Sequence, residues 1–131
     1  MKNKLTVLII LLIYSFWSHL FAQTNTDSIF RVAIDQAKNH QYSESIINCK
    51  NILIGNPNRT DVMVYMANVY AWDGKFDSAK TYVNKALIIN NKNKDAYASL
   101  LNILLWNKEY ENLLNTANIA ESNTYDNKYD L

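Results

Sequence analysis

Residues 61–90, DVMVYMANVYAWDGKFDSAKTYVNKALIIN, contain two amphipathic patterns separated by a glycine. Apolar residues recur every three or four positions up to Trp72 and again after Phe76, which is the periodicity of a helix with one buried face. Gly74 lies between the two patterns, where a helix end often needs a residue in the left-handed conformation. The stretch therefore predicts two helices joined by a tight turn.

The same pattern occurs on both sides of this stretch at a constant spacing. Asp27, Asp61 and Asp95 are 34 residues apart, and we interpret them as helix-start residues. At this spacing the chain divides into units 27–60, 61–94 and 95–128. The aligned columns include Ala33, Ala67 and Leu101; Tyr42, Phe76 and Tyr110; Ser45, Ala79 and Leu113; and Cys49, Val83 and Ala117. Agreement in so many columns indicates an internal repeat.

A 34-residue helix–turn–helix unit with a small residue in each helix and an aromatic residue opening the second resembles the tetratricopeptide repeat (TPR). The middle unit matches the signature columns of that family at Met66, Ala67, Tyr70, Gly74, Phe76, Ala79, Val83 and Ala86. His40 and Lys108 replace the glycine in the other units. The resemblance implies an all-α fold, a short right-handed α-solenoid of three repeats whose first helices line a concave groove.

A narrower resemblance is to the repeat region of YaiO-type outer-membrane proteins, in which signal-bearing TPR units precede a β-barrel. It is carried by the segments YAWDGKF, residues 70–76, and LWNKEY, residues 105–110. After the third unit only a tail, residues 129–131, remains. We therefore expect either a stand-alone relative of these proteins or the repeat portion of a longer one.

The N-terminus has the pattern of a secretory signal peptide. Lys2 and Lys4 form a positive start, residues 5–17 are almost continuously apolar, and Ala22 supplies a small residue at the end. We expect cleavage after Ala22, which makes residues 1–22 the signal peptide and residues 23–26 a short linker. The alternative is an uncut membrane anchor, since residues 5–22 approach the length that crosses a bilayer. The pattern predicts an exported protein, periplasmic or associated with the outer membrane.

The composition argues against most catalytic, metal and nucleic-acid chemistry. The net charge of +1 provides no basic excess to hold a phosphate backbone. The single cysteine, Cys49, cannot form an internal disulfide or a multi-cysteine zinc site, and its small apolar column predicts a buried, inert thiol. Two glycines are too few for a phosphate-binding loop. His40 is the only histidine after residue 22. We predict no enzyme activity, no cofactor and no metal ion.

The family's geometry places candidate partner-binding residues on the first helix of each unit: Arg31, Lys38, Tyr65, Asn68, Trp72, Asn102 and Trp106. Asparagine amides can pair with a peptide backbone, and tyrosine and tryptophan offer rigid apolar area. The alternative is that the tryptophans pack as core and the asparagines are solvated. Some family members hold a C-terminal carboxylate with lysines, but Val64 and Ala98 occupy the positions where lysines are needed.

The last helix, expected near residues 111–121, would have no following unit to cover its apolar side chains, Leu113, Leu114, Ala117 and Ile119. These residues are either a docking face, for a second copy, a partner or further chain, or an ordinary exposed helix end. The sequence thus predicts a non-enzymatic exported adaptor that binds a protein or peptide, contacts no nucleic acid, and meets a membrane only through its N-terminal segment or an envelope partner.

Overall fold

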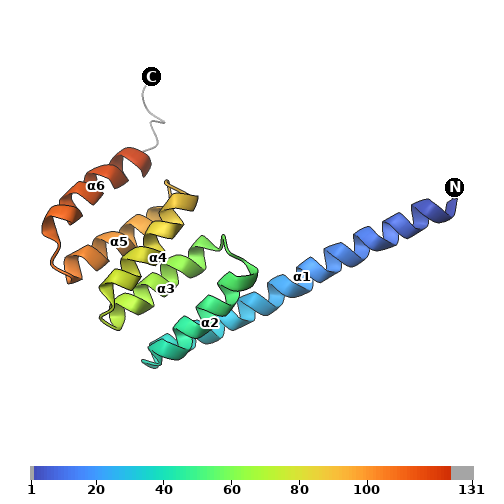
Figure 1. Ribbon diagram of the computed structural model, residues 1–131, viewed down its shortest axis with the longest axis horizontal. Helices are drawn as coiled ribbons and strands as arrows, with labels where there is room; N and C mark the ends of the chain where they lie inside the picture. The colour runs from blue at the N-terminus through green and yellow to red at the C-terminus, as the bar shows by residue number, and fades with distance from the viewer. Residues whose placement is uncertain (1, 125–131) are drawn as a thin grey trace, which may run out of the picture.

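The protein is described by a computed structural model that gives the backbone of residues 2–124 and the side chains of residues 6–15 and 25–124. The helices are α1 (Lys2–Lys38), α2 (Tyr42–Gly55), α3 (Thr60–Trp72), α4 (Phe76–Ile89), α5 (Lys94–Trp106) and α6 (Tyr110–Thr124). Figure 1 shows them stacked in a row, each connected to the next by a short turn. The described backbone has no strand. The predicted all-α solenoid of helix–turn–helix units is therefore confirmed.

The helices recur with the period of the sequence repeat. The second helices begin at Tyr42, Phe76 and Tyr110, each 34 residues after its counterpart, and α3 and α5 begin at Thr60 and Lys94 with the same spacing. Tyr42 and Phe76 pack partly buried against the core, which explains why an aromatic residue opens these helices. The end of the predicted third unit, residues 125–128, and the tail lie outside the described residues.

Helix α1 differs from the expected organisation at the N-terminus. It is continuous over 37 residues, and its N-terminal half projects away from the other helices (Figure 1). The expected linker at 23–26 is helical, and Asp27 lies inside the helix instead of starting one. The physical reason is that no proline or glycine occurs before Gly55, so nothing interrupts the helix. Asp61 and Asp95, by contrast, lie in the first turns of α3 and α5, as predicted.

The projecting half of α1 exposes its apolar side chains. Val7–Tyr14 are all exposed. Among the residues whose side chains are described, no helix combines the length and hydropathy needed to cross a bilayer.

The three turns between paired helices share one backbone geometry. His40, Gly74 and Lys108 have φ values of 61°, 73° and 61°, in the left-handed region. After Gly74, the N–H of Lys75 donates to the carbonyl of Tyr70 at 2.8 Å. This six-to-one hydrogen bond defines a Schellman motif, which ends a helix. The matching bonds at the other turns, both 2.9 Å, are Gln41 N–H to Gln36 O and Glu109 N–H to Leu104 O.

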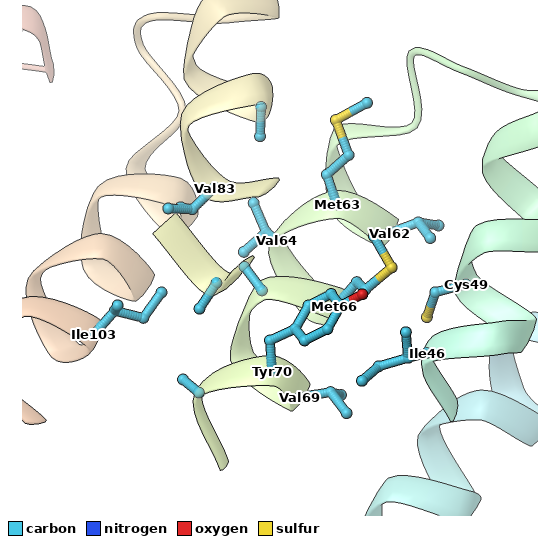
Figure 2. Packing of buried hydrophobic residues seen from close by; sticks show 14 of the residues in the cluster. Ile46, Cys49, Val62, Met63, Val64, Met66, Val69, Tyr70, Val83 and Ile103 are labelled. Carbon is cyan, nitrogen blue, oxygen red and sulfur yellow. The ribbon is translucent and has the colours of Figure 1, made fainter. Parts of the chain in front are cut away.

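Helix α3 lies at the centre of the hydrophobic core. Figure 2 shows its side chains between Ile46 and Cys49 of α2 on one side and Val83 of α4 and Ile103 of α5 on the other. Its buried residues are Val62, Met63, Val64, Met66, Ala67, Val69, Tyr70 and Ala71. Because it has neighbours on both sides, it buries more than one face.

The prediction for Cys49 is confirmed. Its side chain is fully buried, and burial raises the pKa of the thiol to about 12. Since the thiolate is the reactive form, this thiol is inert at neutral pH.

Candidate functional site

Helices α1, α3 and the start of α5 surround a solvent-open hollow of about 390 Å³. Two of the predicted groove residues, Tyr65 and Asn68, line it. The complete lining is Phe30, Ile34, Thr60, Asp61, Val64, Tyr65, Asn68, Asn93 and Asp95. The hollow lies on the first helices of successive units, which is the concave side that the family resemblance implies.

An aromatic row of Phe30, Tyr65 and Trp72 runs along one side of the hollow, and its first two members line it. The rings of Phe30 and Tyr65 meet edge to face with centroids 5.4 Å apart, and Tyr65 meets Trp72 in the same way at 6.1 Å. The Tyr65 hydroxyl donates to the carbonyl of Ile34 at 3.4 Å, which ties α3 to α1. Burial raises the pKa of Tyr65 to about 12, so the hydroxyl stays a neutral donor. Tyr65 is therefore a link between two units as well as part of the wall.

The predicted tryptophans are not core residues. Trp72 and Trp106 end α3 and α5 and are 45% and 46% exposed. Neither lines the hollow, but Trp72 continues the aromatic row at its edge. Their exposed area is available for contact.

The two predicted asparagines differ in their surroundings. Asn68 is half-buried in the hollow and has no hydrogen-bond partner among the described residues. Asn102, its counterpart on α5, is exposed outside the lining. A third amide in the lining, Asn93, accepts a hydrogen bond from the N–H of Ala96 at 3.0 Å and caps α5. Asn68 is therefore the amide in the lining that can offer both its donors and its acceptor to a ligand.

The predicted cations of the first unit are not among the residues that line the hollow. Arg31 and Lys38 are exposed on α1, and neither is part of the lining. Lys38 faces Asp35 at 3.5 Å.

A different cation, which the sequence did not indicate, holds one edge of the site. Arg59 precedes α3 and pairs with Asp27 at 2.8 Å and with Asp61 at 2.6 Å. Its guanidinium also lies 5.7 Å from the ring centroid of Phe30. The hydrogen bonds from Arg59 lower the pKa of Asp61. Asn93 occupies the same repeat position in the next unit, so the repeat alignment carried no signal for this residue.

The lining is acidic. Asp61 and Asp95 occupy the same repeat position on α3 and α5, and both line the hollow. Asp95 has no ion-pair partner within the part of the chain that the structure describes. Val64 lies in the lining where a carboxylate-binding relative would need a lysine. None of the lining residues is lysine or arginine, so the arrangement cannot hold a carboxylate by charge.

The four residues of the expected docking face on α6 do not all point the same way: some pack inward and others are exposed to solvent. Leu113 packs against the core and Ala117 is partly buried, whereas Leu114 and Ile119 are 67% and 44% exposed. Leu113 and Ala120 are seven residues apart, so both face inward on one side of the helix.

In the described parts of the chain, no three histidine, cysteine or acidic side chains gather closely enough to hold a metal ion.

Comparison with known proteins supports the fold. No family model matches the chain, and no curated protein matches it. Among solved structures, the chain is similar to the first TPR of Spaghetti (RPAP3) bound to the HSP90 peptide SRMEEVD, with 16% identity and a TM-score of 0.67 over 75% of this chain and 78% of that one. It is also similar to the Sgt2 TPR domain from Aspergillus fumigatus, with 15% identity and a TM-score of 0.70 over 76% and 66% of the two chains. The fold is therefore that of TPR domains.

Proposed function

We propose that this chain is a non-enzymatic scaffold that binds a protein or peptide segment in its concave hollow. The observation that carries the proposal is the combination of an aromatic wall with the unpartnered amide of Asn68 in one hollow of about 390 Å³. Ligand sites of this kind combine a mainly apolar lining with a few convergent polar groups. The Asn68 amide can pair with the backbone of an extended segment while the wall covers its side chains.

The similar structures support this use of the fold. One of them, the first TPR of Spaghetti, is bound to a peptide. In this chain, we propose that a segment is held in the hollow of the TPR fold, and that the lining of this chain decides which ligand it takes.

A capture experiment with a single substitution tests the proposal. The immobilised full chain is exposed to a cell-envelope extract, and bound proteins are quantified for the wild type, Asn68→Ala and Asn84→Ala. Asn84 is exposed on α4, outside the hollow, so its variant is the matched control. Loss of one amide hydrogen bond costs about 0.5–1.5 kcal/mol, so we expect roughly 2- to 10-fold weaker capture for Asn68→Ala alone. Equal capture by both variants would place the site elsewhere.

We also propose that the chain is exported. The support is the positive start followed by the apolar residues 5–17 and the exposure of Val7–Tyr14 on the projecting half of α1. Sequencing the N-terminus of protein recovered from the cell envelope tests this. A first residue of Gln23 indicates cleavage, and Met1 indicates a retained segment.

The second candidate function is that of the repeat portion of a YaiO-type outer-membrane protein. Two observations favour it: the segment at residues 70–76, and the exposed Leu114 and Ile119 on the last helix. Sequencing the gene past codon 131 distinguishes the two candidates, because a continuing or frameshifted pattern of amphipathic strands supports the second.

A further inference from the structure

We propose that the hollow selects a cationic segment, a stretch of peptide with net positive charge in which a lysine or arginine lies next to an apolar residue. This inference rests on the proposed function and names the chemistry of the ligand. It follows from the charge of the lining and from the position of the aromatic wall beside it.

The lining carries negative charge that the protein itself does not balance. Asp61 and Asp95 face the hollow, and no lysine or arginine lines it. Arg59 is the nearest partner of Asp61, but the same guanidinium also pairs with Asp27. Two carboxylates therefore share one arginine, and Asp95 has no ion-pair partner among the described residues. A ligand with positive charge would complement this surface, and one with negative charge would meet repulsion.

The wall beside these carboxylates suits the stem of a long basic side chain. Phe30, Ile34 and Tyr65 present apolar area in the same hollow as Asp61 and Asp95. Lysine and arginine bury their methylene stems along such surfaces and keep the charged end in a polar place. A basic side chain could thus lie along the wall with its charged end at the carboxylates, while Asn68 pairs with the backbone.

The same features argue against an acidic peptide such as SRMEEVD, the ligand of the similar Spaghetti structure. Val64 offers no charge to a carboxylate, and Asp61 and Asp95 would repel one. We therefore expect this TPR fold to prefer a positively charged ligand, in contrast to the acidic peptide of the Spaghetti structure.

Selection from a random dodecapeptide phage library tests the inference. The full chain, kept in mild detergent, is compared with Asp95→Lys, with Asn68→Ala and with Glu44→Lys. Asp95 is exposed, so its replacement leaves the core intact. Glu44 is exposed on α2 outside the hollow, so its variant matches the change in net charge. Circular dichroism checks that each variant stays helical.

We expect peptides selected on the wild type and on Glu44→Lys to be enriched in lysine and arginine, and this enrichment to disappear on Asp95→Lys. A selected basic peptide should bind Asp95→Lys about 3- to 10-fold more weakly than the wild type, and its binding should weaken further as salt is raised.

Two outcomes overturn the inference in distinguishable ways. Selected peptides without a basic bias, or with an acidic one, whose binding still falls in Asn68→Ala would refute the charge preference and leave the groove function standing. Selection of no peptide, or of peptides that bind Asn68→Ala as well as the wild type, would refute both.

Discussion

The middle helix pair, α3 and α4, and the last pair, α5 and α6, follow the same 34-residue pattern but bury different amounts of it. Val83 of α4 is fully buried, whereas its counterpart Ala117 on α6 is partly exposed. Lys80 of α4 pairs with Glu109 of the next unit at 2.6 Å. Leu114 occupies the same position on α6 and is 67% exposed, with no following unit among the described residues to meet it.

The comparison shows that burial in this fold depends on place in the stack as much as on residue type. Helix α3 has neighbours on both sides, whereas α6 packs on α5 and buries only Ala120. In repeat proteins each unit contacts only its neighbours, so stability is approximately a sum over units and interfaces. The middle pair should therefore carry most of the cooperative stability, and the last helix should contribute least.

The largest expected effect tests this difference directly. Met66 is fully buried on α3, so Met66→Ala should lower the free energy of unfolding by about 2–5 kcal/mol through lost burial and a cavity. Leu114→Ala on α6 should change it by less than about 0.5 kcal/mol, as for other exposed substitutions. Urea unfolding followed by circular dichroism measures both.

Similar decreases in the free energy of unfolding for the two substitutions would contradict the inferred difference between α3 and α6. They would mean that α6 is covered in solution by a second copy or by another part of the chain.

A smaller effect is expected in the first pair, at the position equivalent to Ala79. Ser45 is fully buried on α2, and its Oγ has no hydrogen-bond partner among the described residues. An unsatisfied buried hydroxyl is costly, so Ser45→Ala should raise the free energy of unfolding by about 1 kcal/mol. Thermal unfolding compared with that of the exposed control Ser43→Ala measures the gain. A loss of stability would show that the hydroxyl has a partner after all.

The smallest expected effect concerns the turn of the last pair. Lys108 holds a φ of 61°, which is strained for a residue with a Cβ. Lys108→Gly should therefore stabilise the protein by about 0.5–1 kcal/mol. In the middle pair the opposite change, Gly74→Ala, should destabilise it by a similar amount, although an added Cβ at Gly74 meets no atom within 4 Å. Chemical denaturation of both variants checks the pair, and equal signs would contradict the shared turn geometry.

Much of the fold could be predicted from the sequence because the 34-residue pattern occurs three times. Columns such as Cys49, Val83 and Ala117 identified the inward faces of the second helices, and Gly74 identified a turn. The same turns at His40 and Lys108 were less certain, because residues other than glycine adopt a left-handed backbone only uncommonly. In these two turns the Schellman hydrogen bonds and the packing of the flanking helices hold the conformation despite its local cost.

The candidate site was predictable only in part. Of the groove residues that the family's geometry suggested, Tyr65 and Asn68 line the hollow, and their role in binding stays a prediction. The link made by Arg59 was missed because it depends on two carboxylates that are 34 residues apart, and no pattern within one unit indicates such a pairing. Asp61 and Asp95 were interpreted as helix-start residues, which is correct, but the first turns of α3 and α5 also border the hollow.

The uniform turn geometry has a consequence for the gene. Because the turns at His40, Gly74 and Lys108 direct the next helix in the same way, a duplicated or deleted copy of one unit would leave its neighbours in register. Each added copy would extend the concave surface by one more set of positions equivalent to Asp61, Val64 and Asn68. The length of peptide that such a protein can bind would then change by one repeat unit at a time. The existing contacts would not need to change.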